Sequence, residues 1–132
     1  MEIVIDTAAV LAVLLEEPER PALLAASTGA VLFAPGSLPW EVGNALVAAV
    51  RRRRLTSAEA EAGWTAYQAI PIRLVEVDIG RAMALATERG LYAYDGYMLE
   101  LARSRSLPLL TLDARLRDAA QLAGVALIGI VQ

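Results

Sequence analysis

Two short apolar runs in this chain are each followed by an aspartate, and this repeated arrangement strongly constrains the fold. Ile3 to Ile5 precedes Asp6, and Leu107 to Leu112 precedes Asp113. Apolar runs of this length are typical of strands that are buried on both faces of a parallel sheet. Open α/β sheets bind ligands at the carboxyl ends of such strands. An aspartate there can also cap the following helix, so Asp6 alone is equally consistent with a cap and with a functional site.

Helical and strand patterns alternate along the rest of the chain. Further buried strands are predicted at Ala30 to Ala34, Ile72 to Val77 and Val125 to Val131. Caps, glycines and prolines limit the predicted helices, which run from Thr7 to Glu17, from Glu19 to Ser27, from the Ser37 cap to about Arg54, from the Thr56 capping box to Pro71, from the Asp78 cap to Gly90, from Leu91 to Ala102 and from Arg115 to Ala123. The alternation predicts a single α/β domain over residues 1–132, with a central parallel sheet of about five strands between two layers of helices.

The residue types that are absent exclude several kinds of chemistry. The chain contains no His, Cys or Lys, and all 12 of its basic residues are Arg. A Ser-His-Asp or Cys-His nucleophile, a thiolate or imidazole zinc site and a P-loop lysine are therefore excluded. Carboxylates, hydroxyls and arginines remain, and such oxygen ligands favour Mg²⁺ or Mn²⁺. The absence of Cys fits a cytoplasmic protein, and the sequence predicts neither a signal peptide nor a membrane span.

Two further acidic residues lie in the first turns of predicted helices. Glu41 has Asn44 three residues later on the same side of its helix, and Asp95 begins another helix. The helix dipole alone favours an acid in a first turn. If the sheet brings these residues to Asp6 and Asp113, however, carboxylates ~4 Å apart would repel each other by about 4 kcal/mol. A divalent cation would relieve this repulsion and lower the pKa of bound water, which is the chemistry of phosphodiester hydrolysis.

Other charged and aromatic residues have simpler interpretations. Arg51 to Arg54 lie on all sides of a helix end, where cations are stabilising, and they could also steer phosphate locally, as could Arg115 or Arg117. Asp78 is interpreted as an N-cap and Asp118 as a solvated surface residue. Trp64 is interpreted as a packing or subunit-contact residue. The net charge of −3 argues against a general nucleic-acid binder.

Several segments occur together in the order of a known family. They are V-I-D-T at 4–7, A-P at 34–35 through E-V-G-N-A-L at 41–46, Y-D-G-Y-M-L-E-L-A at 94–102, L-L-T-L-D-A-R-L at 109–116 and G-V-A-L-I at 124–128. Together they span nearly the whole chain, which resembles the PIN-domain proteins and specifically the VapC-type ribonuclease toxins. By this resemblance Asp6, Glu41, Asp95 and Asp113 are the catalytic acids, and they bind one or two Mg²⁺ or Mn²⁺ ions.

The resemblance extends to polar residues around the acids, with two departures. Thr7 and Thr111 match positions where the family places hydroxyls near the metal or the phosphate, and Asn44 matches a common polar neighbour of the glutamate. Gly96 replaces the usual alanine after the third acid, and Tyr97 lies one place earlier than the family's frequent aromatic residue. Neither departure removes an acid. A glycine there costs roughly 0.5–1 kcal/mol of helix propensity, which a first turn can absorb.

The function implied by the resemblance is that of a metal-dependent endoribonuclease toxin of a type II toxin–antitoxin pair. Its substrate would be single-stranded or loop RNA, whose exposed bases proteins can read. Its partner would be a VapB-like antitoxin that inserts an Arg or Lys over the acids. A homodimer is also implied, and Trp40 and Trp64 could supply its apolar contact. The alternatives are a nuclease that processes RNA or DNA, and a non-catalytic binding module of the same fold.

Overall fold

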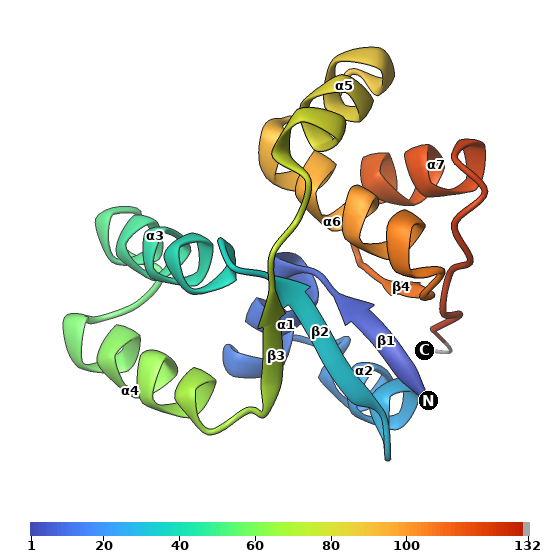
Figure 1. Cartoon of the computed structure of the whole chain (residues 1–132). Coiled ribbons are helices and arrows are strands. Elements are labelled where there is room, and N and C mark those ends of the chain that lie inside the picture. The colour runs from blue at the N-terminus through green and yellow to red at the C-terminus, as the bar shows by residue number, and fades with distance from the viewer. Residues whose placement is uncertain (131–132) are drawn as a thin grey trace.

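A parallel four-stranded sheet forms the centre of the computed structural model, which describes residues 1–130 (Figure 1). The strands are β1 (Glu2–Ile5), β2 (Val31–Pro35), β3 (Ile72–Val75) and β4 (Leu109–Leu110). They lie in the order β3-β2-β1-β4, and all neighbouring pairs are parallel. Because β1 lies inside the sheet, the residues that follow it lie between those that follow β2 and those that follow β4.

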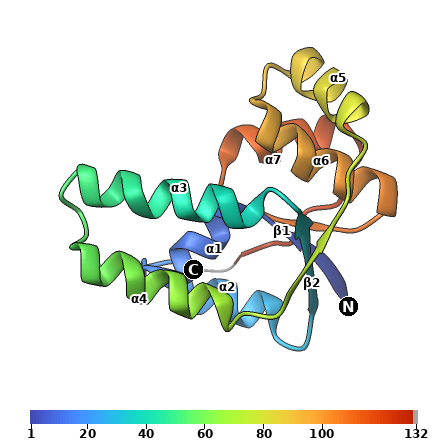
Figure 2. The same cartoon turned by 60° about the vertical axis from the view of Figure 1, so that its left-hand side comes forward.

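Helices cover both faces of this sheet. They are α1 (Thr7–Leu14), α2 (Arg20–Ser27), α3 (Leu38–Arg51), α4 (Ser57–Gln68), α5 (Ile79–Arg89), α6 (Ala93–Arg105) and α7 (Ala114–Leu122). α5, α6 and α7 form one lobe, in which α6 contacts β1 and β2. α1 contacts α2, α3 and α4 in a second group (Figure 2). The predicted three-layer α/β/α fold with a parallel sheet is therefore confirmed.

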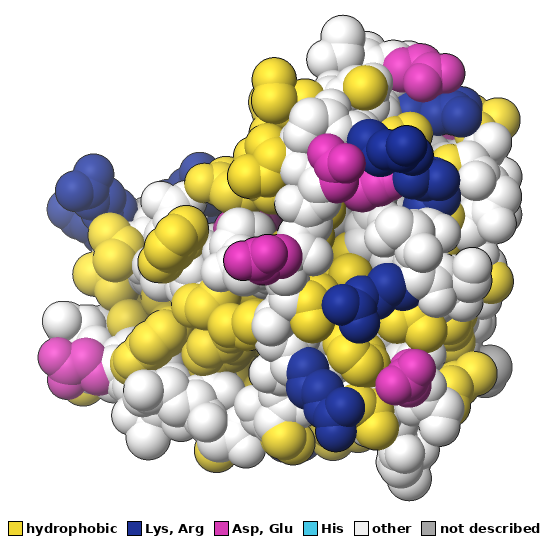
Figure 3. Space-filling view, viewed as in Figure 1, with side chains coloured by type: hydrophobic (Ala, Val, Ile, Leu, Met, Phe, Trp, Pro, Cys, Tyr) yellow, Lys and Arg dark blue, Asp and Glu magenta, His cyan; other side chains and the backbone are white. Residues whose placement is uncertain are grey.

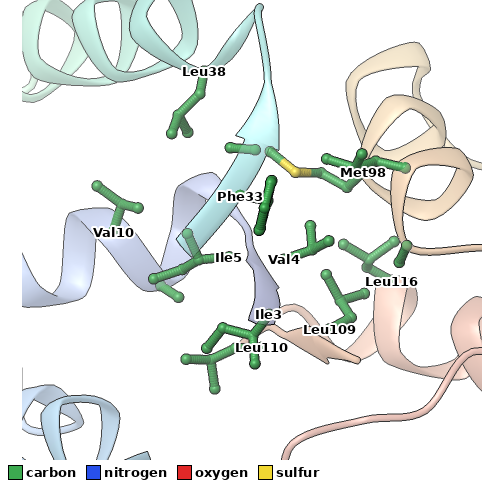
Figure 4. Packing of buried hydrophobic residues seen from close by; sticks show 14 of the residues in the cluster. Ile3, Val4, Ile5, Val10, Phe33, Leu38, Met98, Leu109, Leu110 and Leu116 are labelled. Atoms are coloured by element: carbon green, nitrogen blue, oxygen red, sulfur yellow. The ribbon is translucent and has the colours of Figure 1, made fainter. Parts of the chain in front are cut away.

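Side chains of the central strands alternate between two buried faces. Val4 and Leu109 point toward the side of Met98 in α6, whereas Ile5 points toward Val10 of α1 (Figure 4). All five side chains are buried. A sheet that is covered on both faces needs apolar residues at successive positions. This explains why the apolar runs of β1 and β4 are continuous and do not alternate with polar residues.

The strand predicted at Leu107 to Leu112 is shorter in the structure. Only Leu109 and Leu110 pair with β1, in register with Val4 and Ile5. Pro108 has no N–H with which to extend the ladder in the N-terminal direction. The strand predicted at Ile72 to Val77 likewise ends early, at Val75.

The fifth strand, predicted at Val125 to Val131, is reduced to a single parallel bridge between Leu109 and Leu127. The Leu109 N–H donates to Ala126 O at 2.9 Å, and the Ile128 N–H donates to Leu109 O at 3.0 Å. This segment therefore runs beside β4 without forming a longer ladder up to residue 130. Val131 lies outside the described residues.

Two predicted helix starts are confirmed by their caps. The Thr56 hydroxyl accepts from the Glu59 N–H at 3.1 Å, and the Glu59 carboxylate accepts from the Thr56 N–H at 2.8 Å, which completes the capping box. Asp78 accepts from the Arg81 N–H at 3.0 Å and caps α5. Short-range sequence signals locate these helix starts because the bonds join residues three apart.

The C-terminal limits of two helices differ from the prediction. α1 ends at Leu14 and not at Glu17, and Glu16 has a φ of 52°. α3 ends at Arg51 and not near Arg54, and Arg53 has a φ of 59°. These left-handed residues end the helices, although neither is a glycine. α6 is shifted as well, because it begins at Ala93 and extends to Arg105.

None of the helices within residues 1–130 combines the length and apolar character needed to span a bilayer.

Candidate active site

The four predicted acids converge at the carboxyl end of β1. Asp6 follows β1 directly, Glu41 lies in the first turn of the helix after β2, and Asp113 follows β4. The chain passes from β1 to β2 on one side and reaches β4 on the other, so this is a point where the strand order reverses. Such switch points are the places where open parallel sheets bind ligands. Asp95 comes from the first turn of α6, which packs on β1 and β2.

Asp6 is both a helix cap and a buried carboxylate. Its Oδ1 accepts from the Ala9 N–H at 2.9 Å, and its Oδ2 accepts from the Thr111 hydroxyl. The side chain is only 4% exposed. Burial raises the pKa of Asp6 from 3.8 to about 6, opposed by these two hydrogen bonds and assisted by the charges of Asp113 and Asp95. The sequence left open whether Asp6 is a helix cap or a site residue. The structure is compatible with both, because one carboxylate caps α1 and also faces other acids.

Thr111 connects the first and fourth acids. Besides donating to Asp6, its Oγ1 accepts from the Asp113 N–H at 3.0 Å. The Asp113 Oδ1 then accepts from the Arg115 N–H at 2.9 Å and from the Leu116 N–H at 3.2 Å, which caps α7. A buried hydroxyl and two caps thus hold these carboxylates on neighbouring strand ends.

Glu41 is held by two hydroxyl groups from different segments. Thr7 donates to its Oε1 and Ser37 donates to its Oε2, each at 2.9 Å. Burial raises the pKa of Glu41, the two hydroxyl bonds lower it, and the charge of Asp95 raises it further. Ser37 occupies the N-cap position of α3, as predicted, but its side chain makes no cap hydrogen bond, because its hydroxyl bonds to Glu41. Ser37 is therefore a site residue that the sequence analysis missed.

Asp95 is the remaining member of the acidic cluster, which also contains Asp6, Glu41 and Asp113, and it acts on the others through its charge. Burial raises the pKa of Asp95, the charge of Asp113 adds to this, and the positive charge of Arg115 opposes it. Since Asp95 also raises the pKa of Asp6 and of Glu41, it interacts with all three other acids. Within residues 1–130, however, no three carboxylates are close enough together to hold a metal ion without further ligands.

The chemistry of this donor set fits a hard divalent cation. Four carboxylates and the hydroxyls that bond to them offer only oxygen, which is the ligand type of Mg²⁺ and Mn²⁺. Burial is the main cause of the raised pKa values of Asp6, Glu41 and Asp95, and neighbouring acids raise them further, so a bound cation would favour their charged forms. Mg²⁺ is often bound through one or two carboxylates and several waters, so the separation of the acids is compatible with it.

The remaining predicted residues lie at the edge of the cluster. Arg115 is exposed at the start of α7, where its charge acts on Asp95. Asn44 is exposed on α3 and makes no side-chain hydrogen bond to another described residue. Asp118 is exposed on α7, as expected of a surface residue. The structure thus joins Thr7 and Thr111 to the acids directly, but not Asn44.

Comparisons with known proteins agree on the fold. PAE2754 from Pyrobaculum aerophilum matches with a TM-score of 0.72 and 22% sequence identity, over 97% of this chain and 92% of that chain. VapBC2 from Rickettsia felis, solved with a DNA fragment from their promoter, matches with a TM-score of 0.66 and 9% identity, over 96% of this chain and 97% of that chain. A search of curated proteins gave no match. A family profile described as PIN domain matches residues 3–122.

Proposed function

The chain belongs to the PIN domain family, and we propose that it is a metal-dependent endoribonuclease that acts as the toxin of a type II toxin–antitoxin pair. The observation that carries this proposal is the mutual interaction of the carboxylates of Asp6, Glu41, Asp95 and Asp113. Like charges at such a site either take up protons or bind a cation. The resemblance of the surrounding motifs to VapC-type toxins supports the choice of RNA as the substrate.

The four acids would hold one or two Mg²⁺ or Mn²⁺ ions, and the hydroxyl residues would orient the acids. Such ions, when bound, lower the pKa of water and offset charge on a phosphate oxygen. Thr111 fixes the rotamer of Asp6 through Oδ2, while Thr7 and Ser37 occupy both oxygens of Glu41. These bonds favour the charged form of the two carboxylates, which is the form that a cation needs.

A VapB-like antitoxin and a second copy of the chain are the proposed protein partners. The fold similarity to VapBC2 supports the antitoxin. Its basic side chain would meet the carboxylates and compete with RNA. Trp40 and Val47 are 76% and 55% exposed on α3, and such apolar exposure supports a homodimer contact on this helix.

RNA cleavage and growth together test this function. Purified protein should cut single-stranded RNA with Mg²⁺ or Mn²⁺, lose the activity in EDTA and regain it when Mn²⁺ is added in excess. Expression should arrest growth, and co-expression of the adjoining small gene product should relieve the arrest. Asp113→Asn should not arrest growth, whereas Asp78→Asn should, because Asp78 is an exposed helix cap outside the four acids. Cleavage that is insensitive to EDTA would contradict the metal mechanism.

The affinity for Mn²⁺ should fall below about pH 6. The pKa of Asp6 is raised to about 6, so at lower pH a proton must leave before the carboxylate can bind a cation. One displaced proton predicts an affinity about tenfold lower near pH 5 than near pH 7.5. Isothermal titration calorimetry at the two pH values measures this ratio. An affinity that stays constant across the range would argue against Asp6 as a ligand.

Removing the Ser37 hydroxyl should weaken metal binding without unfolding the protein. Ser37→Ala leaves Glu41 Oε2 without its 2.9 Å donor, which raises the pKa of Glu41 further and frees its rotamer. Loss of such a supporting bond typically lowers metal affinity about tenfold or more. Ser27→Ala is the matched control, because that hydroxyl bonds within α2 to Leu23 O. Equal Mn²⁺ affinities for the two variants would show that Ser37 does not orient Glu41.

A further inference from the structure

A pocket of about 500 Å³ lies between the end of α5 and α7, apart from the four acids. Its lining residues are Glu88, Arg89, Arg115, Asp118, Ala119 and Leu122. Both helices belong to the lobe that also contains α6 (Figure 1). Figure 3 shows arginine and acidic side chains intermixed on this lobe. The pocket lining therefore combines four charged side chains with Ala119 and Leu122, and the charges come from two helices that are distant in sequence.

Both arginines of the pocket lack an ion-pair partner within residues 1–130. The Nε of Arg89 is buried and has no hydrogen-bond partner within residues 1–130. Ion pairs in the same range join only Arg81 to Asp78 and Arg103 to Glu100, so neither arginine of the pocket is paired. A guanidinium whose N–H group is buried without a partner is costly, and a ligand with several acceptor oxygens is suited to it.

Arg115 places this pocket next to the acidic cluster. Its charge lowers the pKa of Asp95, and its backbone N–H donates to Asp113 at 2.9 Å. A strand whose scissile phosphate lies at the four acids would therefore carry a neighbouring phosphate toward α7. Arginine suits such a phosphate because its guanidinium offers paired donors.

We propose that Arg89 and Arg115 bind the phosphate of the nucleotide next to the scissile bond. This inference rests on the proposed nuclease function and adds a substrate-positioning site to it. Glu88 and Asp118 balance the two positive charges, so the pocket has no net charge. It favours one phosphate of a strand that is already held at the acids, and it does not attract nucleic acid in general.

Binding and cleavage of a short single-stranded oligoribonucleotide test the pocket. Arg89→Gln and Arg115→Gln should each raise KM about tenfold and change kcat less than about twofold, since the lost contact is made equally in ground and transition states. The control is Arg81→Gln, because Arg81 is exposed near the start of α5 and outside this pocket. Fluorescence anisotropy of a labelled oligoribonucleotide with Ca²⁺ in place of Mn²⁺ measures binding while a cation with oxygen ligands can still hold the strand at the acids. Because both arginines bind one phosphate, the slope of log Kd against log salt should decrease by about 0.7 in total when both are removed, and by less in each single variant.

The outcomes separate this inference from the proposed function. If the wild-type protein cleaves RNA while both variants keep its Kd and salt slope, the pocket is not a phosphate site and the nuclease proposal stands. If Arg89→Gln only lowers the melting temperature, Arg89 has a structural role and the inference fails. If binding with Ca²⁺ depends on both arginines but no RNA is cleaved with Mn²⁺, the phosphate site stands and the nuclease proposal falls. An oligoribonucleotide that does not bind the wild-type protein also overturns the inference.

Discussion

Asp6→Asn should abolish RNA cleavage and, without metal, make the protein more stable by about 2 kcal/mol near pH 7.5. The pKa of Asp6 is raised from 3.8 to about 6 in the folded protein, so folding disfavours the charged form. That shift corresponds to about 3 kcal/mol. Asn carries no charge and still accepts from the Ala9 N–H, but its amide cannot accept the Thr111 proton, which makes the gain smaller.

The stability difference between wild type and Asp6→Asn should depend on pH, and the pKa shift of Asp6 fixes the direction of that dependence. Between about pH 4 and pH 6 the folded wild-type protein binds more protons than the unfolded chain, so its stability falls as the pH rises. The advantage of Asp6→Asn should therefore be absent near pH 4 and complete above about pH 6.5. Urea unfolding of both proteins near pH 4 and above about pH 6.5 measures this difference in the free energy of unfolding. Adding Mn²⁺ should stabilise the wild-type protein and leave the variant unchanged.

Asp78→Asn is the matched control for this experiment. Asp78 is an exposed N-cap, and Asn caps a helix about as well as Asp. Its stability should change little at any pH, and its cleavage activity should persist. An Asp6→Asn protein that is less stable than wild type near pH 7.5 would show that hydrogen bonding outweighs the cost of the buried charge.

Sequence reasoning located the residues whose signals are local or follow directly from a strand. Asp6 and Asp113 were found because each follows an apolar run, and Asp78 because its cap spans three residues. Glu41 and Asp95 needed the family resemblance, because the helix dipole explains an acid in a first turn equally well. The parallel sheet also followed from the alternation of elements, but the position of β1 between β2 and β4 did not.

The residues that sequence reasoning missed depend on an alternative side-chain partner or on unusual burial. Ser37 has the residue type and position of a cap, and only the fold shows that its hydroxyl serves Glu41. Glu100 is 1% exposed in α6, where an apolar pattern would assign a solvent-facing acid. Arg103, one turn later, donates to both of its carboxylate oxygens, which satisfies the buried charge. Both pairs do have a helical spacing, four residues for Ser37 and Glu41 and three for Glu100 and Arg103, but this spacing does not reveal which of the side chains are buried.

Gly96→Ala should destabilise the protein by about 2 kcal/mol, although alanine is the better helix former. A Cβ at Gly96 would lie 2.6 Å from Ala82 O and 2.9 Å from the Ala86 Cβ, so α5 and α6 would have to separate. Overpacking of this kind costs roughly 1–3 kcal/mol or more, against a gain in helix propensity of about 1 kcal/mol. Close packing of α5 against α6 thus explains why glycine, and not the family's usual alanine, occupies position 96. This is a stronger reason than the ability of a first helical turn to absorb the helix-propensity cost of glycine.

Gly43→Ala on α3 is the control, because a Cβ there meets nothing within 4 Å. It should stabilise the protein by roughly 0.5–1 kcal/mol through helix propensity alone. Gly96→Ala/Ala86→Gly should recover only part of the loss, since the Ala82 carbonyl belongs to the backbone and remains in the way. Because Asp95 precedes Gly96, separation of the helices should also displace this acid and reduce cleavage. A Gly96→Ala protein as stable and active as wild type would mean that α5 moves away at no cost, and that the packing of these helices does not position Asp95.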